Sequence, residues 1–200
     1  MAYHYSNIGY AILGLALERA AGRPFERLVA EEVLGPLGME SASFRPPPAR
    51  SRRLAAGYVN LEDGTIDPRV PRAEHRGRGY KVPSEGLYAT AGDLARLVMG
   101  LSGALGDTLL DDDARAAMLR DRAPDGDDRA GYGLGLQLTR IGDVLLAGHS
   151  GTVAGYSSYL VFDRSTRAGV VLLRSYNRGE TNLAAEAQRL VLEIGEALSR

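Results

Sequence analysis

The last third of the 200-residue chain combines short strands with one amphipathic helix, and this combination narrows the possible folds most. Four segments favour strands separated by turns: residues 132–140, 144–147, 156–162 and 169–173. In the closing segment, apolar residues recur at helical spacing, namely Leu183, Ala187, Leu190, Ile194 and Leu198. Thr181 or Asn182 can cap this helix. The pattern predicts an antiparallel meander backed by a C-terminal helix.

The first half of the chain is predicted to be mainly helical. Apolar residues at helical spacing predict a helix over 8–21, and Gly22 and Pro24 end it. A second helix is predicted over 25–34. Thr90 and Asp93 form a capping pair for a helix that ends near Gly103, and a shorter helix is predicted over 112–120.

The segment 45–84 is rich in glycine and proline and is expected to be mostly loop with short strands. We therefore predict the α+β class. Residues up to about 125 form a helical and loop portion, and residues from about 126 to 200 form the antiparallel strands and final helix.

Charge and composition exclude several function classes. The 24 basic and 25 acidic residues are dispersed and give a formal net charge of −1, so no nucleic-acid or anionic-membrane footprint is present. The chain has no cysteine, which removes disulfides, thiolate metal sites and cysteine nucleophiles. No apolar run is long enough to cross a bilayer, and an export signal would have to lie upstream. The sequence therefore does not indicate the cellular compartment.

Tyr5, Ser6 and Asn7 lie directly before the first apolar helix. Polar side chains at such a junction can point into a cleft. The alternative interpretation is structural: Ser6 or Asn7 caps the helix and Tyr5 packs. Spacing alone leaves both interpretations open.

Several motifs in one order resemble the class C β-lactamase-like family within the penicillin-binding serine hydrolases. The matching segments are Tyr5-Ser6-Asn7-Ile8-Gly9-Tyr10 with Leu13-Gly14, Gly22-Arg23-Pro24-Phe25, Pro36-Leu37-Gly38-Met39 with Phe44, Glu85-Gly86-Leu87-Tyr88-Ala89-Thr90 with Asp93-Leu94, and Gly148-His149-Ser150-Gly151-Thr152 with Gly155-Tyr156. The resemblance covers nearly the whole chain and implies a β-lactamase/transpeptidase-like fold.

The resemblance implies a role for each residue of two motifs. Tyr5 and Asn7 match the family's Tyr-x-Asn motif, with Tyr5 as proton shuttle and Asn7 as donor to the substrate's amide. His149, Ser150 and Gly151 match the Lys/His-Thr/Ser-Gly motif: the first two would bind a substrate carboxylate and the glycine would leave room. The backbone N–H of Thr152 would be one oxyanion-hole donor.

The family's third motif, Ser-x-x-Lys, occurs nowhere in these residues. The only lysine is Lys81, and Arg78 stands three residues before it. In the family this motif supplies the nucleophile and its activating lysine upstream of Tyr-x-Asn. We therefore expect a truncated chain, lacking the N-terminal strands and nucleophile helix and inactive alone.

Three hypotheses follow. The chain is part of a serine hydrolase acting on small amides or esters (β-lactams, D-Ala peptides or esters); or it is a non-catalytic carboxylate-binding module; or it is a fragment completed by an N-terminal segment on another polypeptide. Lactamase, peptidase and esterase share these motifs, so the sequence does not separate them. No cofactor is expected.

Other motifs lack the residues or the structural context that their usual functions require. Gly148-His149-Ser150-Gly151 partly matches the nucleophile-elbow motif of α/β-hydrolases. However, Thr152 stands where the motif needs a glycine, and a strand is predicted where the motif needs a helix. Gly131, Gly133 and Gly135 lack the following helix of a dinucleotide site. His4 and His75 have no partners at metal-ligand spacing, and Asp111–Asp113 is a solvated helix start, so no metal is expected.

Overall fold

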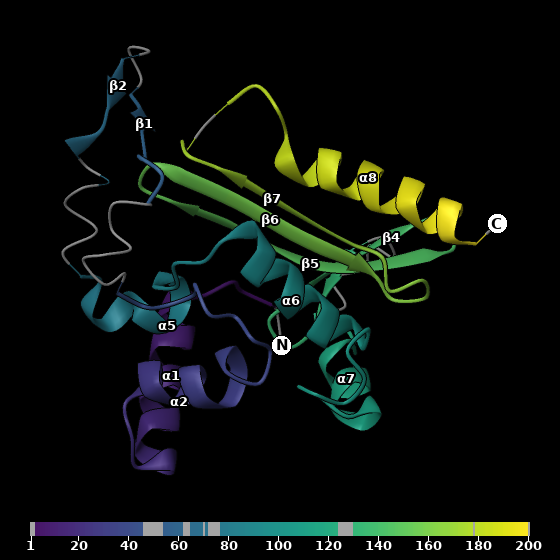
Figure 1. Ribbon diagram of the computed structural model, residues 1–200, viewed down its shortest axis with the longest axis horizontal. Coiled ribbons are helices and arrows are strands. Elements are labelled where there is room, and N and C mark those ends of the chain that lie inside the picture. Colours follow the sequence, from purple (N-terminus) through teal and green to yellow (C-terminus); the bar gives the residue numbers. More distant parts are fainter. Residues whose placement is uncertain are drawn as a thin grey trace.

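The computed structural model describes residues 3–45, 54–61, 65–69, 71, 77–123, 130–177 and 179–199. Its centre is a five-stranded antiparallel sheet in the order β3-β4-β5-β6-β7, so each strand pairs with its neighbour in sequence (Figure 1). The strands are β3 (Ala130–Tyr132), β4 (Gln137–Ile141), β5 (Val144–Val153), β6 (Tyr156–Asp163) and β7 (Gly169–Arg174). The predicted α+β class and antiparallel meander are confirmed.

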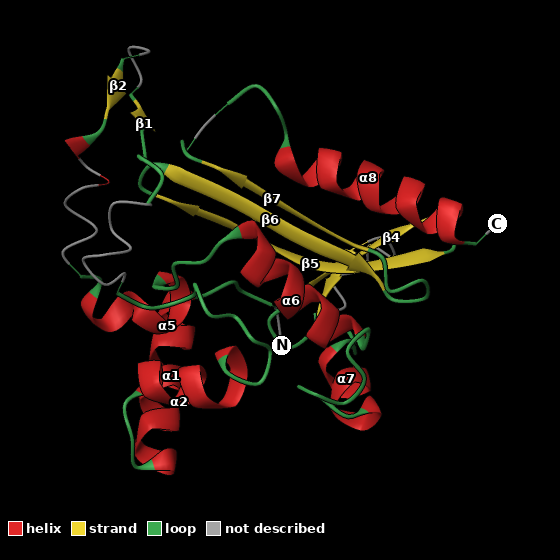
Figure 2. Cartoon of the chain, in the orientation of Figure 1, coloured by secondary structure: helices red, strands yellow, loops and turns green. Residues whose placement is uncertain are grey.

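Helices cover both faces of this sheet (Figure 2). The C-terminal helix α8 (Leu183–Leu198) lies on one face and α6 (Ala91–Ser102) on the other. Successive side chains of a strand point to opposite faces. Val161 therefore joins the core beneath α8 and Phe162 the core beneath α6, and both are almost fully buried.

The predicted helix caps are present. The Thr90 hydroxyl accepts the backbone N–H of Asp93, and the Asp93 carboxylate accepts the backbone N–H of Thr90, which completes a capping box for α6. Asn182, rather than Thr181, caps α8 by accepting the N–H groups of Ala184 and Ala185. The short helix α7 (Asp112–Met118) is capped by Asp111 and ends slightly before the predicted boundary.

Helix α1 (Asn7–Ala21) is capped by Ser6, whose Oγ accepts the N–H of Gly9 at 2.9 Å. The second predicted helix begins at Phe25 as α2 (Phe25–Val29) and continues as the π-helical turn η1 (Ala30–Leu34). Gly14 is the buried residue of α1. It packs so closely against Pro83 that a Cβ atom at this position would lie 2.3 Å from the proline ring, so a larger residue would collide there.

Two further features lie within the predicted loop 45–84. A two-stranded ribbon joins β1 (Val59–Asn60) to β2 (Ile66–Asp67), as the expectation of short strands allowed. The helical turns η2 (Gly79–Lys81) and α5 (Val82–Glu85) were not predicted, and α5 packs beside α1. Residues 46–53, 62–64, 70 and 72–76, including His75, lie outside the described part of the chain.

The apolar residues of α1 are largely exposed. Ile8 is 66% exposed, Ile12 63% and Leu15 46%. Among the helices that the structure describes, none is long and apolar enough to cross a membrane.

Candidate active site

The first part of the site is the N-terminus of α1. Ser6 provides the cap, so the structural interpretation of that residue is correct. Tyr5 precedes the cap with its side chain 53% exposed, so it does not pack into the core. Asn7 is the first residue of the helix and is also exposed. Both residues therefore remain accessible to a ligand.

The second part of the site is the end of β5. Strand β5 runs without a break through His149, Ser150 and Gly151 to Val153, and pairs with β6 over this stretch. Gly151 permits this pairing because a Cβ atom there would lie 2.6 Å from the hydroxyl of Ser158. The strand predicted over 144–147 was therefore too short, because Gly148 and Gly151 allow close contact with β6 rather than ending the strand.

One edge of β5 is open at this end. Strand β4 pairs with β5 only as far as Gly148, whose partner is Gln137. From His149 to Val153, no described strand pairs with the edge of β5 that faces away from β6. Backbone N–H and C=O groups on an open edge are available to a ligand.

The fold brings the two motifs together. The ring centroids of Tyr5 and His149 lie 6.1 Å apart, although the two residues are 144 positions apart in sequence. This contact joins the N-terminus of α1 to the open end of β5. The structural interpretation of residues 5–7, in which a polar residue caps the helix and Tyr5 packs, does not predict that Tyr5 lies beside His149.

Tyr132 is a site residue that the sequence did not single out. Its hydroxyl lies 3.0 Å from Nε2 of His149, and its ring meets the Tyr5 ring edge to face at a centroid distance of 6.3 Å. Tyr3 also contacts it, with ring centroids 5.0 Å apart. The short connection between β3 and β4 was the sequence signal that could have predicted this contact. It pairs Tyr132 with Gln137, and Gln137 in turn pairs with Gly148, the neighbour of His149.

Burial favours the neutral forms of His149 and Tyr132. It lowers the pKa of His149 below its ordinary value of 6.5, although a hydrogen bond to the backbone of Ser150 acts in the opposite direction. Burial also raises the pKa of Tyr132, and the neighbouring tyrosines raise it further. A neutral His149 offers hydrogen bonds to a ligand rather than a positive charge.

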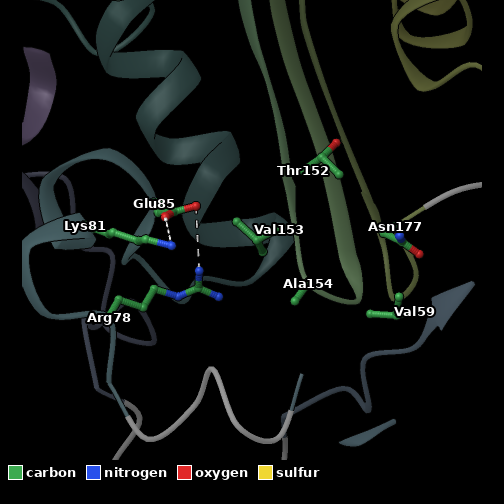
Figure 3. A pocket seen from close by; sticks show the side chains of 8 residues that line it. All are labelled: Val59, Arg78, Lys81, Glu85, Thr152, Val153, Ala154 and Asn177. Atoms are coloured by element: carbon green, nitrogen blue, oxygen red, sulfur yellow. Dashed lines mark ion pairs between the residues drawn. The ribbon is translucent and has the colours of Figure 1, made fainter. Parts of the chain in front are cut away.

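A cavity of about 360 Å³ adjoins the end of β5 (Figure 3). Its lining residues are Val59, Arg78, Lys81, Glu85, Thr152, Val153, Ala154 and Asn177. Arg78 and Lys81 each lie 3.8 Å from the carboxylate of Glu85. Thr152, the predicted oxyanion residue, itself lines this cavity and lies three residues beyond His149 on β5.

The structure shows the context of the two glycine motifs that the sequence analysis rejects. The Gly148–Gly151 segment lies inside a strand that turns into β6, whereas a nucleophile elbow needs a strand, a sharp turn and a helix. Gly131 and Gly133 lead into β4 rather than into a helix. In the described part of the chain, no three histidine, aspartate or glutamate side chains are grouped to hold a metal.

An antiparallel sheet covered by helices on both faces, with Tyr-x-Asn and His-Ser-Gly at one end, defines the fold class of the penicillin-recognising serine hydrolases. The Beta-lactamase family model matches residues 2–193. The chain belongs to this family, which is of the serine hydrolase type.

Two curated relatives and one solved structure illustrate the similarity. "Putative beta-lactamase-like 1" of Homo sapiens is 37% identical over 118 residues, covering 58% of this chain and 22% of the relative. The D-alanyl-D-alanine-carboxypeptidase/endopeptidase AmpH of Escherichia coli K12 is 33% identical over 92 residues, covering 46% of this chain and 21% of the relative. D-amino acid amidase from Ochrobactrum anthropi has a similar fold, with a TM-score of 0.76 at 22% identity, covering all of this chain and 60% of the amidase. The chain thus spans only part of each protein.

Proposed function

We propose that this chain supplies the proton-transfer and substrate-binding part of a serine hydrolase active site. The reaction would be acyl transfer from a small amide or ester through an acyl-enzyme. The observation that carries the proposal is the contact between Tyr5 and His149 beside the open edge of β5, since it joins both family motifs at one place. The family membership and the peptidase and amidase relatives support an amide substrate.

Each residue has a proposed task. Tyr5 accepts the proton of an attacking serine hydroxyl, which requires a nearby cation to stabilise the phenolate. Asn7 donates to the substrate's amide carbonyl, and the N–H of Thr152 donates to the developing oxyanion. His149 and Ser150 hydrogen-bond a substrate carboxylate or an equivalent group, with Gly151 allowing the strand to lie close to Ser158.

The nucleophile and its lysine must come from residues outside this sequence, because Ser-x-x-Lys does not occur in it. The exposed apolar residues Ile8 and Ile12 support the proposal that a complementing N-terminal segment packs on α1. Such a segment would bring the serine and the cation that Tyr5 needs to the same end of the helix.

A second candidate function is carboxylate binding without catalysis, which the open edge of β5 and the His149 cluster support. A covalent acyl-enzyme is expected only for the hydrolase, so its formation distinguishes the two functions. We would add a segment carrying Ser-x-x-Lys, fused or as a separate polypeptide, and incubate the product with fluorescent penicillin. Stoichiometric covalent labelling that requires the added serine supports the hydrolase, and reversible binding without labelling supports the binding module.

A further inference from the structure

The cavity beside Thr152 has walls from four separate parts of the chain. The ribbon strand β1 contributes Val59, the end of β5 contributes Val153 and Ala154, and Asn177 follows β7 (Figure 3). The charged residues are Arg78, which directly precedes η2, Lys81 in η2 and Glu85 in α5. The wall at Asn177 is held in place, because its side-chain oxygen accepts the N–H of Asn60 at 2.9 Å.

The charges of the lining residues are unequal. Arg78 and Lys81 carry two positive charges and Glu85 carries one negative charge, so the lining residues that the structure describes have a formal charge of +1. Both cations approach the same carboxylate at 3.8 Å, longer than a direct hydrogen bond. The Arg78 side chain is only 7% exposed, so solvent screens its charge less than that of Lys81, which is 47% exposed.

The position of the cavity decides which part of a substrate it would meet. Along β5, the proposed carboxylate-binding residues His149 and Ser150 come first, and Thr152 and Val153, which line the cavity, come last; Ala154 lines it just after the strand ends. If the reacting carbonyl lies at the N–H of Thr152, and the carboxylate bound by His149 belongs to the leaving group as in a D-Ala peptide, the leaving side of the substrate extends toward His149. The acyl side then extends toward the cavity.

We propose that this cavity is an acyl-side subsite that selects substrates whose acyl group bears a carboxylate. The inference rests on the proposed function, which places the carbonyl at Thr152. Val59, Val153 and Ala154 would pack against a short apolar stem, and Lys81 and Arg78 would hold the acidic end. The volume of about 360 Å³ is within the range of small-ligand sites.

A binding experiment on the chain as it stands tests the charge preference without turnover. The probes are N-methylglutaramate, which has an amide at one end and a carboxylate at the other, and its neutral twin N-methylglutaramide. Dissociation constants are measured by NMR titration at low salt. Because one cation is half exposed, we expect the anionic probe to bind about three- to tenfold more tightly, a preference that shrinks at high salt.

Two variants with opposite effects assign the preference to this cavity. Lys81→Gln should reduce the preference to less than about twofold, whereas Glu85→Gln should increase it by removing the negative charge that lies 3.8 Å from both cations. Arg140→Gln is the matched control, since it removes one exposed positive charge from β4, far from the cavity along the sheet. An equal affinity for both probes, or a preference unchanged in Lys81→Gln, would overturn the proposal. Either result leaves the serine hydrolase proposal intact, because that proposal is tested separately by covalent labelling.

Discussion

The hydroxyl of Tyr132 lies 3.0 Å from Nε2 of His149, so a residue of the edge strand β3 contacts the candidate substrate-binding histidine on β5. When Nδ1 of His149 holds the ring proton, the phenol donates to Nε2. This hydrogen bond favours the neutral imidazole that burial also favours.

Replacing Tyr132 with phenylalanine should therefore raise the pKa of His149. A hydrogen bond of about 1 kcal/mol corresponds to roughly 0.5 to 1 pKa unit. The measurement is the pH titration of the imidazole signals by NMR, with His149→Gln to assign them. Tyr176→Phe, in which the altered tyrosine follows β7, is the control. A His149 pKa that is unchanged or lowered in Tyr132→Phe would show that the phenol does not donate to Nε2.

The free energy of unfolding should depend on pH in the way expected for a protein in which His149 is buried and neutral. The folded-state pKa of His149 is lowered below 6.5, so the unfolded chain takes up a proton first as pH falls. Stability from this group is complete above pH 6.5 and is lost below it, down to the folded pKa. Urea unfolding at successive pH values measures the loss, and His149→Gln should flatten the curve in this window. A parallel curve for the variant would contradict the assignment.

Sequence patterns predicted most elements of this fold for identifiable reasons. The Thr90–Asp93 box and the stripe of α8 depend on neighbours in sequence, so local patterns suffice. The end of β5 was missed because Gly148 and Gly151 look like strand breakers until β6 is placed beside them. Tyr132 was missed for a similar reason: its contact with His149 depends on strand register.

The exposed residues of α1 should make the chain self-associate. Ile8 and Ile12 lie one turn apart, both more than half exposed. Size-exclusion chromatography and a dye for apolar surface should show association and dye binding. Both should fall in the double variant Ile8→Ser/Ile12→Ser, with Ile194→Ser on α8 as control. A monomeric parent chain with little dye binding would count against an uncovered packing surface.

The chain alone should not hydrolyse a chromogenic cephalosporin or a nitrophenyl ester above a control protein. The reason is chemical: these residues contain no serine with a lysine three positions later, so no activated nucleophile is expected. Purified chain at high concentration is sufficient for the assay. Stoichiometric labelling of the chain by fluorescent penicillin would refute the missing-nucleophile argument.

The most direct test of the central claim is the acylation rate of the chain completed by a Ser-x-x-Lys segment, measured with and without Tyr5→Phe. Phenylalanine keeps the shape of the ring but offers no proton acceptor, so the rate should fall by about two to four powers of ten. Circular dichroism must show that both proteins fold alike, and Tyr176→Phe should keep the parent rate. If the completed enzyme keeps its full acylation rate after Tyr5→Phe, Tyr5 is not the proton shuttle and the proposed site is wrong.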